Sequence, residues 1–241
     1  MRELILLLAL CLPLPGAVAL IGNTKASASG NSTATTPPVD TTGAHLLVAV
    51  AVTYSTVSCG AGVTMSDSKN GSTWTSVQNY AQGTANICVW YKANPAVGTG
   101  HTFSFAPHVS GGYPTLFVSY WSGAATTTPK DASHSGAGSA AGTTLQPGSI
   151  TPAEDNELLI TAMGHNDTGN TTVSVEFTRQ DTQTNNSYAT GAWGYEIQTT
   201  ATARNPTWTL TTSGVARVAA LAAFKAAGAA PPAAARRRVI N

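Results

Sequence analysis

The chain has 241 residues, a formal net charge of +1, and only 10% charged residues. Ordinary soluble domains carry about 25% charged residues, so solubility here depends on hydroxyl and amide groups, as in secreted proteins and virion shells. A net charge this close to zero argues against nucleic acid or an acidic membrane as a partner, because both require a concentrated basic field. The one basic run, residues 236–238, lies in an Ala/Pro-rich tail and is expected to be solvated.

The first 19 residues have the features of a secretory signal peptide. Arg2 precedes an apolar run at residues 4–14, and residues 17–19, Ala-Val-Ala, are the small residues that signal peptidase accepts. We therefore expect a mature chain that begins at Leu20, located outside the cell or on its surface, with no membrane contact after cleavage. The alternative is an uncleaved anchor, although the apolar run is short for a membrane span.

The first half of the mature chain predicts short strands separated by turn residues. Residues 46–54 read LLVAVAVTY, an apolar run typical of a strand inside a sheet. A frayed strand is expected before this run, and further strands after it: residues 21–38, a strand that starts at Trp74, and residues 87–93, 101–105 and 114–122.

A loop with two special features follows the apolar strand. The interval from Leu47 to Trp74 is nine residues longer than the corresponding interval from Leu159 to Phe177, so this loop is an insertion in the first half. Residues 67–71 contain Asn-Gly, whose two residues tolerate positive φ, and therefore predict a β-hairpin.

The insertion also holds one of two cysteines of the mature chain. Cys11 lies in the expected signal peptide, which leaves Cys59 and Cys88. An even pair in an exported protein predicts a disulfide between them.

The second half follows a Gly/Ala/Ser/Thr-rich crossover, residues 123–142, for which no strand is predicted. Residues 215–227 look helical because they are Ala-rich, but their alignment with the first half predicts a strand instead. The expected strands are residues 157–163, 172–178, 189–198, 206–210 and 215–225, and the tail from residue 228 should be flexible.

The two halves repeat the same order of motifs. Four pairs of segments align, at offsets of 112, 104, 105 and 104 residues: TTGAHLLVAV with TPAEDNELLITA, VWYKA with WGYEI, TFSF with TWTL, and Tyr120 of FVSYWSGA with Phe224 of LAAFKAAG. Each half contains four or five short strands and cannot bury its apolar faces alone, so the second half supplies the opposing surface. We predict an all-β, jelly-roll-like β-sandwich of two tandem homologous halves. Residues 20–227 form a single domain, with half one at about 20–125 and half two at about 126–227, before a tail at 228–241.

A resemblance supports this fold. The segments LLVAVAVTY, DSKNGSTWT, VWYKANPAVGTGHTF, YWSGAATTTPKDA, LQPGSITPAEDNELLI and ALAAFKAA resemble uncharacterised secreted bacterial, metagenomic and phage-associated β-sandwich proteins. The resemblance covers nearly all of the mature chain and implies a jelly-roll or concanavalin-like sandwich. The family has no agreed catalytic residues, so none is transferred. Here DSKNGSTW departs from the commoner DSxGNTW of the family, which affects the expected type of turn.

The sequence has no motif that predicts catalysis or a cofactor. Sandwich glycosidases carry two carboxylates on one concave face, as in ExDxE, whereas the nearest acidic cluster here, residues 154–157, is expected to be a solvated turn. Five histidines lack zinc-site spacing, and no GxSxG, Walker or dinucleotide motif is present. Asp67 with Asn70 could contribute calcium ligands, but turn formation explains them equally well. We therefore assign no catalytic residue, metal or cofactor, and expect a protein that is not an enzyme.

Three classes of function remain after these exclusions. We favour a secreted or surface-attached adhesion or glycan-binding module, whose partner is a glycan or surface polymer. One alternative is a structural virion or appendage protein that associates with itself, and the other is a hydrolase on a sandwich scaffold. Fold alone does not separate these classes.

Strand periodicity gives the first candidate ligand-binding residue. Alternate side chains of a strand face opposite ways, and the alignment pairs Val89 with Trp193 in a row that includes Tyr91. This row should be buried. Trp90 then lies on the other face, and in the alignment its counterpart in the second half is Gly194.

The same argument gives the second candidate. Tyr120 aligns with Phe224, a buried type of residue, so that Trp121 aligns with Lys225, which prefers water. Trp90 and Trp121 could then form an exposed stacking platform for a sugar or a neighbouring subunit. The alternative is that loops or the insertion cover both tryptophans.

Overall fold

The computed structural model describes residues 17–55, 59, 63–107, 112–135, 138–139, 141–186 and 188–228, and all of the regular structure within them is β-strand. The first eight strands are β1 (Ala19–Ser27), β2 (Ala34–Thr35), β3 (Leu46–Tyr54), β4 (Thr64–Asp67), β5 (Thr75–Gln82), β6 (Ala85–Ala93), β7 (Phe103–Ala106) and β8 (Thr115–Ser122). The other eight are β9 (Lys130–Ser135), β10 (Thr144–Leu145), β11 (Leu158–His165), β12 (Thr171–Val173), β13 (Thr178–Asn185), β14 (Ala189–Ile197), β15 (Trp208–Leu210) and β16 (Arg217–Phe224). Among these described residues, none forms a helix that could cross a membrane.

The two halves have the same antiparallel topology. The first half forms a five-stranded sheet, β1-β8-β3-β6-β5, and a three-stranded sheet, β2-β7-β4. The second half forms β9-β16-β11-β14-β13 and β10-β15-β12, so each strand number is that of its counterpart plus eight. The order 1-8-3-6 against 2-7-4 is that of a jelly roll, the antiparallel double-sheet fold of eight strands. The predicted fold class, a jelly-roll-like sandwich of two similar halves, is confirmed.

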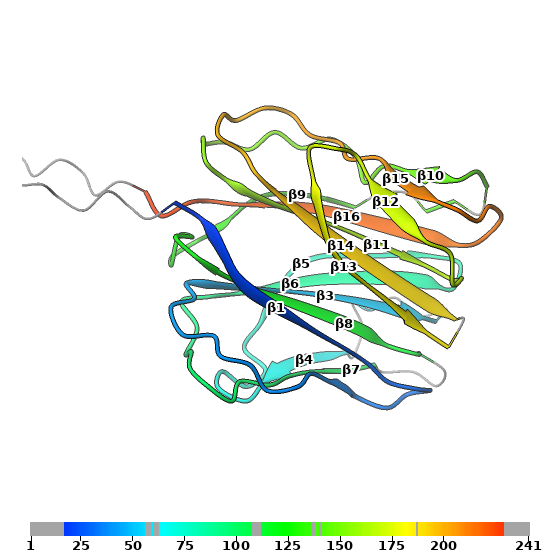
Figure 1. The fold of residues 1–241 in the computed structure, drawn as a ribbon, viewed down its shortest axis with the longest axis horizontal. Helices are drawn as coiled ribbons and strands as arrows, with labels where there is room; N and C mark the ends of the chain where they lie inside the picture. Colours follow the sequence, from blue (N-terminus) through cyan, green and yellow to red (C-terminus); the bar gives the residue numbers. More distant parts are fainter. Residues whose placement is uncertain are drawn as a thin grey trace, which may run out of the picture.

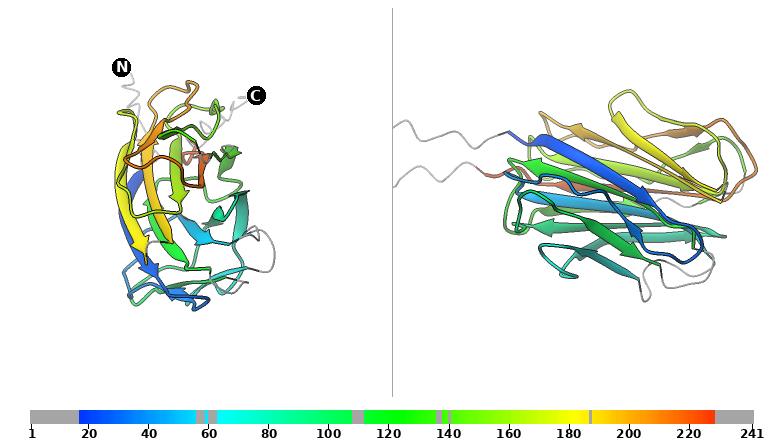
Figure 2. Two further views of the ribbon diagram at one scale, coloured as in Figure 1. Left: turned by 90° about the vertical axis from the view of Figure 1, so that its right-hand side faces the viewer. Right: turned by 60° about the horizontal axis from the view of Figure 1, so that its bottom comes forward.

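The four sheets are stacked as four layers (Figure 1). The five-stranded sheets lie face to face in the middle, where β16 packs on β5 and β6, and β14 packs on β3 and β8. The three-stranded sheets cover the two outer faces, as the end-on view in Figure 2 also shows. The expectation of four or five strands per half was therefore too low, because each half has its own second layer.

The central core lies between the two five-stranded sheets. Val48, Val50 and Val52 of β3 enter it from one side, and Trp193 enters it from the other. Tyr91 and Tyr195 are partly buried against the same cluster, so the predicted apolar row at this position is confirmed. This core joins the halves into one body.

A separate core lies beneath each three-stranded sheet. Leu47, Ala49 and Ala51 of β3 contact the first small sheet, through Phe103 and Phe105. Both faces of β3 are therefore buried, which explains its continuous apolar sequence. Both faces of β16 are buried as well, since all eight of its residues are buried. The prediction of a strand at this Ala-rich segment is confirmed.

Several strands lie where none was predicted. β9 and β10 fall in or just after the expected crossover at residues 123–142, and β13 follows the strand expected at 172–178. β13 has the sequence TRQDTQTN and is an edge strand, so its residues are mostly half-exposed and polar. Edge strands of this kind lack the apolar alternation on which the sequence analysis relied.

The turn at residues 67–71 differs from the predicted hairpin. Asp67 and Gly71 form an isolated antiparallel bridge, and Gly71 has φ of 64°. However, the flanking strands β4 and β5 belong to different sheets, so they do not pair with each other. The Asn-Gly turn carries the chain from the outer layer to the inner layer.

The chain ends were assigned from sequence to a signal peptide and a tail. Residues 1–16 and 229–241 lie outside the described residues, so most of both assignments is not addressed by the structure. β1 begins at Ala19, the last residue of the expected signal peptide, and Val18 is buried in the central core.

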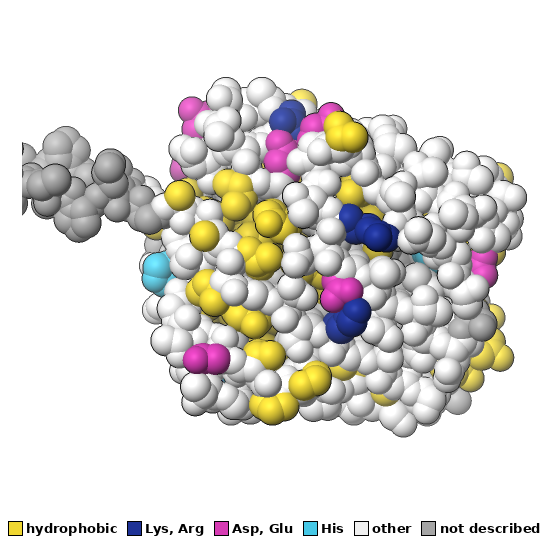
Figure 3. Space-filling view, in the orientation of Figure 1, with side chains coloured by type: hydrophobic (Ala, Val, Ile, Leu, Met, Phe, Trp, Pro, Cys, Tyr) yellow, Lys and Arg dark blue, Asp and Glu magenta, His cyan; other side chains and the backbone are white. Residues whose placement is uncertain are grey.

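The space-filling view shows few charged side chains on the face in Figure 3, in keeping with the low charge content.

Candidate functional site

Trp121 does not lie on an outward face. It is fully buried in the central core, where its indole nitrogen donates to Ser119 Oγ at 2.9 Å. Leu46 pairs with Trp121 in the first half, and Leu158 pairs with Phe224 in the second. Trp121 is thus the counterpart of Phe224, at an offset of 103 residues instead of 104.

The error in the alignment was one residue, which reverses every side chain of a strand. The expected outward orientation of Trp121 is therefore wrong. Since the two five-stranded sheets seal this side chain, it cannot form a ligand platform in this structure.

Trp90 lies on the face that was predicted. It shares the outer face of β6 with Cys88, and the three-stranded sheet covers most of it, leaving 8% exposed. Its ring contacts Phe105 of β7, with centroids 5.6 Å apart. Trp90 is therefore not the exposed platform that was expected.

Trp90 instead lines a groove in the first half. The groove has a volume of about 250 Å³ and lies where β4, the start of β5, and β6 meet. Six uncharged residues line it within the described part of the chain: Val63, Thr64, Met65, Ser72, Trp74 and Trp90. Thr64 and Ser72 are exposed and Trp74 is half-exposed, so hydroxyl and indole groups are open to a ligand.

A buried carboxylate holds Trp74 in place. Asp67 Oδ2 accepts a hydrogen bond from the Trp74 indole nitrogen at 2.8 Å, and the Trp74 ring packs edge-on against Phe103. Asp67 Oδ1 accepts from the backbone nitrogens of Lys69 and Asn70, at 2.8 and 2.6 Å. These bonds stabilise the turn, as was expected of Asp67 and Asn70 from sequence.

The same carboxylate pairs with a buried histidine. His101 Nε2 lies 2.8 Å from Asp67 Oδ1, and both side chains are fully buried. Burial raises the pKa of the Asp67 carboxyl, but hydrogen bonds from His101, Asn70 and Lys69 outweigh it, so the pKa lies below its ordinary value.

The chain of hydrogen bonds continues to a threonine. Thr41 Oγ1 lies 2.9 Å from His101 Nδ1, so the order Thr41, His101, Asp67 is that of a nucleophile, a base and an orienting acid. Thr41 is fully buried, however, and no substrate can reach its hydroxyl in this structure. The network links three segments behind the groove and fixes the orientation of Trp74.

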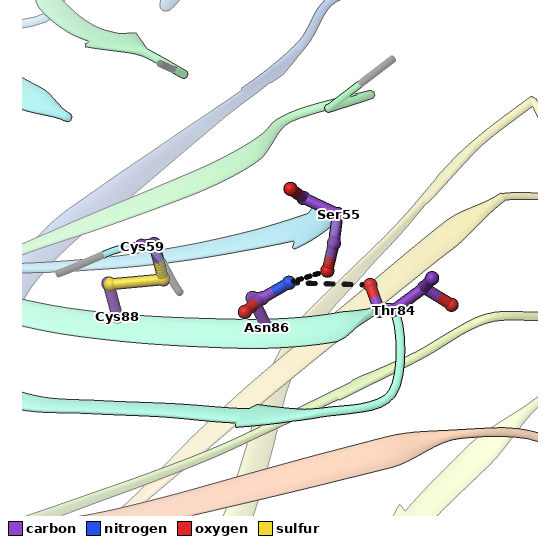
Figure 4. The surroundings of a disulfide bond; sticks show 5 residues. All are labelled: Ser55, Cys59, Thr84, Asn86 and Cys88. Carbon is purple, nitrogen blue, oxygen red and sulfur yellow. Dashed lines mark hydrogen bonds between the residues drawn. A yellow bond between two sulfur atoms is a disulfide. The ribbon is translucent and has the colours of Figure 1, made fainter. Parts of the chain in front are cut away.

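The predicted disulfide is present beside this site. Cys59 and Cys88 are bonded, with Cα atoms 6.0 Å apart, and Cys88 lies two residues before Trp90 on β6 (Figure 4). Farther along β6, Asn86 Nδ2 donates to the carbonyl oxygen of Ser55 at 2.5 Å. Both Ser55 and Cys59 are therefore tied to the strand that carries Trp90.

Among the described residues, the place beside the equivalent residue of the second half is filled in a different way. Gly194 replaces Trp90, and a Cβ atom there would lie 2.7 Å from the carbonyl oxygen of Thr178. Arg179, the counterpart of Ser76, donates to the carbonyl oxygen of Thr171 at 2.6 Å and thus spans from β13 to β12. A glycine and an arginine together close this part of the second half.

The second half has a different hollow, with a volume of about 180 Å³. Its lining includes Glu176 and Arg204, and Arg204 forms an ion pair with Glu196 at 2.7 Å. The two hollows therefore differ in charge as well as in position.

The acidic cluster before β11 differs in part from the expected solvated turn. Residues 154–156 are exposed, but Glu157 is fully buried. Burial, together with the nearby carboxylate of Asp131, raises the pKa of Glu157 to about 7. Within the described residues, no group of three or more His, Cys, Asp or Glu side chains could hold a metal ion.

The remaining histidines are in dissimilar surroundings. His45 is exposed and its Nδ1 accepts from the backbone nitrogen of Gly123, whereas His165 is fully buried. His108 and the side chain of His134 lie outside the described residues.

Sequence analysis identified one residue of the groove, Trp90, and missed the others. Trp74 was assigned only to the start of a strand, and Thr64 and Ser72 carry no distinctive pattern. One signal was available: the interval between Leu47 and Trp74 is longer than its counterpart in the second half, and it contains Val63, Thr64, Met65 and Ser72 of the lining.

Comparisons with known proteins identify no relative. No protein-family model, no curated protein and no solved structure matches this chain. The resemblance described from sequence stays a prediction.

Proposed function

We propose that the protein is an extracellular module that binds saccharides in the first-half groove, and so attaches to a glycan or surface polymer. The observation that carries this proposal is the lining of the groove: two tryptophans and two exposed hydroxyl side chains, with no charge. Small-molecule sites are concave and combine aromatic side chains with a few polar groups, and this groove is bordered by Trp74 and Trp90 with a mainly polar accessible surface. Sugars offer the matching chemistry, with hydroxyls beside C–H faces that pack on aromatic rings.

Two further features support an extracellular location. The Cys59–Cys88 disulfide fits an oxidising compartment. The first 19 residues have the composition of a secretory signal, with an apolar run and small residues before the expected cleavage point.

The test is a glycan array with the secreted protein and three variants. Thr64→Arg and Ser72→Arg each place a long side chain in the groove from an exposed position, so the fold should survive. The matched control is Thr172→Arg, an exposed residue on β12, the counterpart of β4. We expect binding by the parent and the control, and at least about tenfold weaker binding by both groove variants, equivalent to about 1.4 kcal/mol.

Two results would contradict the proposal. One is an absence of saccharide binding by the folded parent protein. The other is binding that Thr64→Arg and Ser72→Arg leave unchanged, which would place the ligand elsewhere. Circular dichroism and thermal melting of each variant establish that the fold is intact.

A further inference from the structure

We infer that the groove selects a short neutral saccharide and rejects acidic ones. This inference depends on the proposed function and specifies its ligand class. Three properties of the groove carry it: the absence of charge in its lining, the pairing of the ionic groups around it, and its size.

Among the described residues, the groove offers no ionic partner to a ligand, because the six that line it are uncharged. A carboxylate or sulfate group placed among them would lose water without gaining a cation, which is costly in a partly enclosed site. Sugar hydroxyls can instead exchange hydrogen bonds with Thr64 and Ser72, because a hydroxyl both donates and accepts.

Two ionic groups bonded to segments beside the groove are already engaged. Asp67 lies behind Trp74, and its two oxygens accept hydrogen bonds from the protein, including the one from Trp74. Lys92 Nζ donates to Thr73 Oγ1 at 2.8 Å and to the Thr73 carbonyl oxygen at 3.2 Å. Recruiting Lys92 for an acidic ligand would break these bonds.

The hollow of the second half shows the contrast within one molecule. Its lining holds Glu176 and Arg204, so a charged site is built at one place on this scaffold. The first-half groove has no counterpart of either group in its lining. Neutrality is thus a property of this groove and not of every hollow in the protein.

The size of the groove limits the ligand. Its volume of about 250 Å³ lies just below the range of roughly 300–1,000 Å³ typical of drug-sized ligands. Trp90 is only 8% exposed and lies against Phe105, so it forms a closed floor. A groove of this volume favours a ligand of one or two sugar units, which would contact Thr64 and Ser72 at the rim.

The experiment measures binding of three saccharide sets by the secreted protein. The sets are neutral hexose oligosaccharides, oligosaccharides with uronic acid, and sulfated oligosaccharides, each from one to four units long. We expect at least tenfold tighter binding of the neutral set, with no gain in affinity beyond two units. Ser72→Lys should raise the affinity for acidic saccharides, since it adds a cation to the rim, whereas Thr172→Lys should not.

The possible outcomes separate the two proposals. Acidic saccharides that bind as tightly as neutral ones, or affinity that continues to rise up to four units, would overturn this inference and leave the saccharide-binding function intact. An absence of binding to every set would overturn the proposed function as well. A Ser72→Lys protein that is folded but shows no change in preference would also overturn the inference, because the rim would then not contact the ligand.

Discussion

One difference between the outer faces of the two halves lies at a pair of equivalent positions, Trp90 in the first half and Gly194 in the second. The strands around them pair in the same way, and both β5 and β13 have a register shift at the same place. Trp90 lines a groove, whereas Gly194 allows the β13 backbone to come close, and Arg179 covers the space above it. A duplicated scaffold thus carries a groove beside Trp90 in one half and a close approach of two strands at Gly194 in the other.

This comparison indicates where the two copies are free to diverge. The central core requires large apolar residues from both halves, because each half covers the other. The outer faces have no such constraint, since each is covered by its own three-stranded sheet. The disulfide, the Asp67–His101 pair and the groove all lie on the outer side of the first half.

The largest effect is expected where the halves are equivalent, in the central core. Trp121→Ala and Phe224→Ala should each lower the free energy of unfolding by about 3–5 kcal/mol, because each removes a fully buried aromatic side chain. Urea denaturation would measure both, with Ser122→Ala as a control expected within about 0.5 kcal/mol. A loss below about 1 kcal/mol for Trp121→Ala would mean that this residue is not a core counterpart of Phe224.

The wrong orientation predicted for Trp121 shows what the sequence could and could not predict. The repeat, the apolar strands and the buried row at Val89 and Tyr91 were all evident, because buried strands have distinctive side chains. The face of Trp121 was misassigned, because FVSYWSGA and LAAFKAAG align almost equally well at neighbouring offsets. Burial of both faces of β8 removes the alternation that would have fixed the register.

The candidate site was harder to predict than the fold. Trp90 was predicted as a candidate because it aligns with a glycine in the second half. Thr64 and Ser72 could not be found, since an exposed hydroxyl residue in a Thr- and Ser-rich chain has no signal of its own. Asp67 and His101 are 34 residues apart in sequence, and the pairing of β4 with β7 brings them together.

The next largest effect is expected from removing the disulfide, which lies on the outer side of the first half. Replacing Cys59 and Cys88 with alanine should lower the free energy of unfolding by about 3–4 kcal/mol in the loop-entropy model, because the bond closes a loop of 29 residues. Ala192 is the natural counterpart of Cys88 in the second half, so alanine is compatible with this position of the fold. Denaturation with and without reductant would measure the effect.

The double alanine variant also serves as the control for the reductant. It should be insensitive to reductant, and thiol titration of the folded, exported parent, which has lost Cys11 with the signal peptide, should find no free thiol. Two titratable thiols in the oxidised, folded protein would contradict the disulfide.

A smaller effect is the pH dependence of the free energy of unfolding, which has opposite signs for one carboxylate of each half. The raised pKa of Glu157 means that folding favours its neutral form, so this stabilising contribution is complete below about pH 4.5 and is lost as pH rises through 7. Glu157→Gln should remove this dependence, and the variant should be more stable than the parent at pH 8 by up to about 3 kcal/mol. Asp67 in the first half has the opposite sign, because its lowered pKa makes its contribution disappear in acid.

Free energies of unfolding at pH 4.5, 6 and 8 would test the Glu157 prediction. Asp155→Asn is the matched control, since Asp155 lies in the same turn but is exposed. A Glu157→Gln protein whose stability declines with pH as steeply as that of the parent would show that another group is responsible.

The smallest effect concerns an ion pair that joins the halves at their edges. Lys25 of β1 and Asp181 of β13 lie 2.7 Å apart, with side chains 39% and 24% exposed. A double-mutant cycle with Lys25→Gln and Asp181→Asn should give a coupling energy of about 0.2–1 kcal/mol, because exposed pairs are well solvated. The coupling should shrink further in roughly 1 M salt, where the screening length is about 3 Å. A coupling above about 2 kcal/mol that persists in high salt would mean that edge charges, and not the central core, set how firmly the two halves are joined.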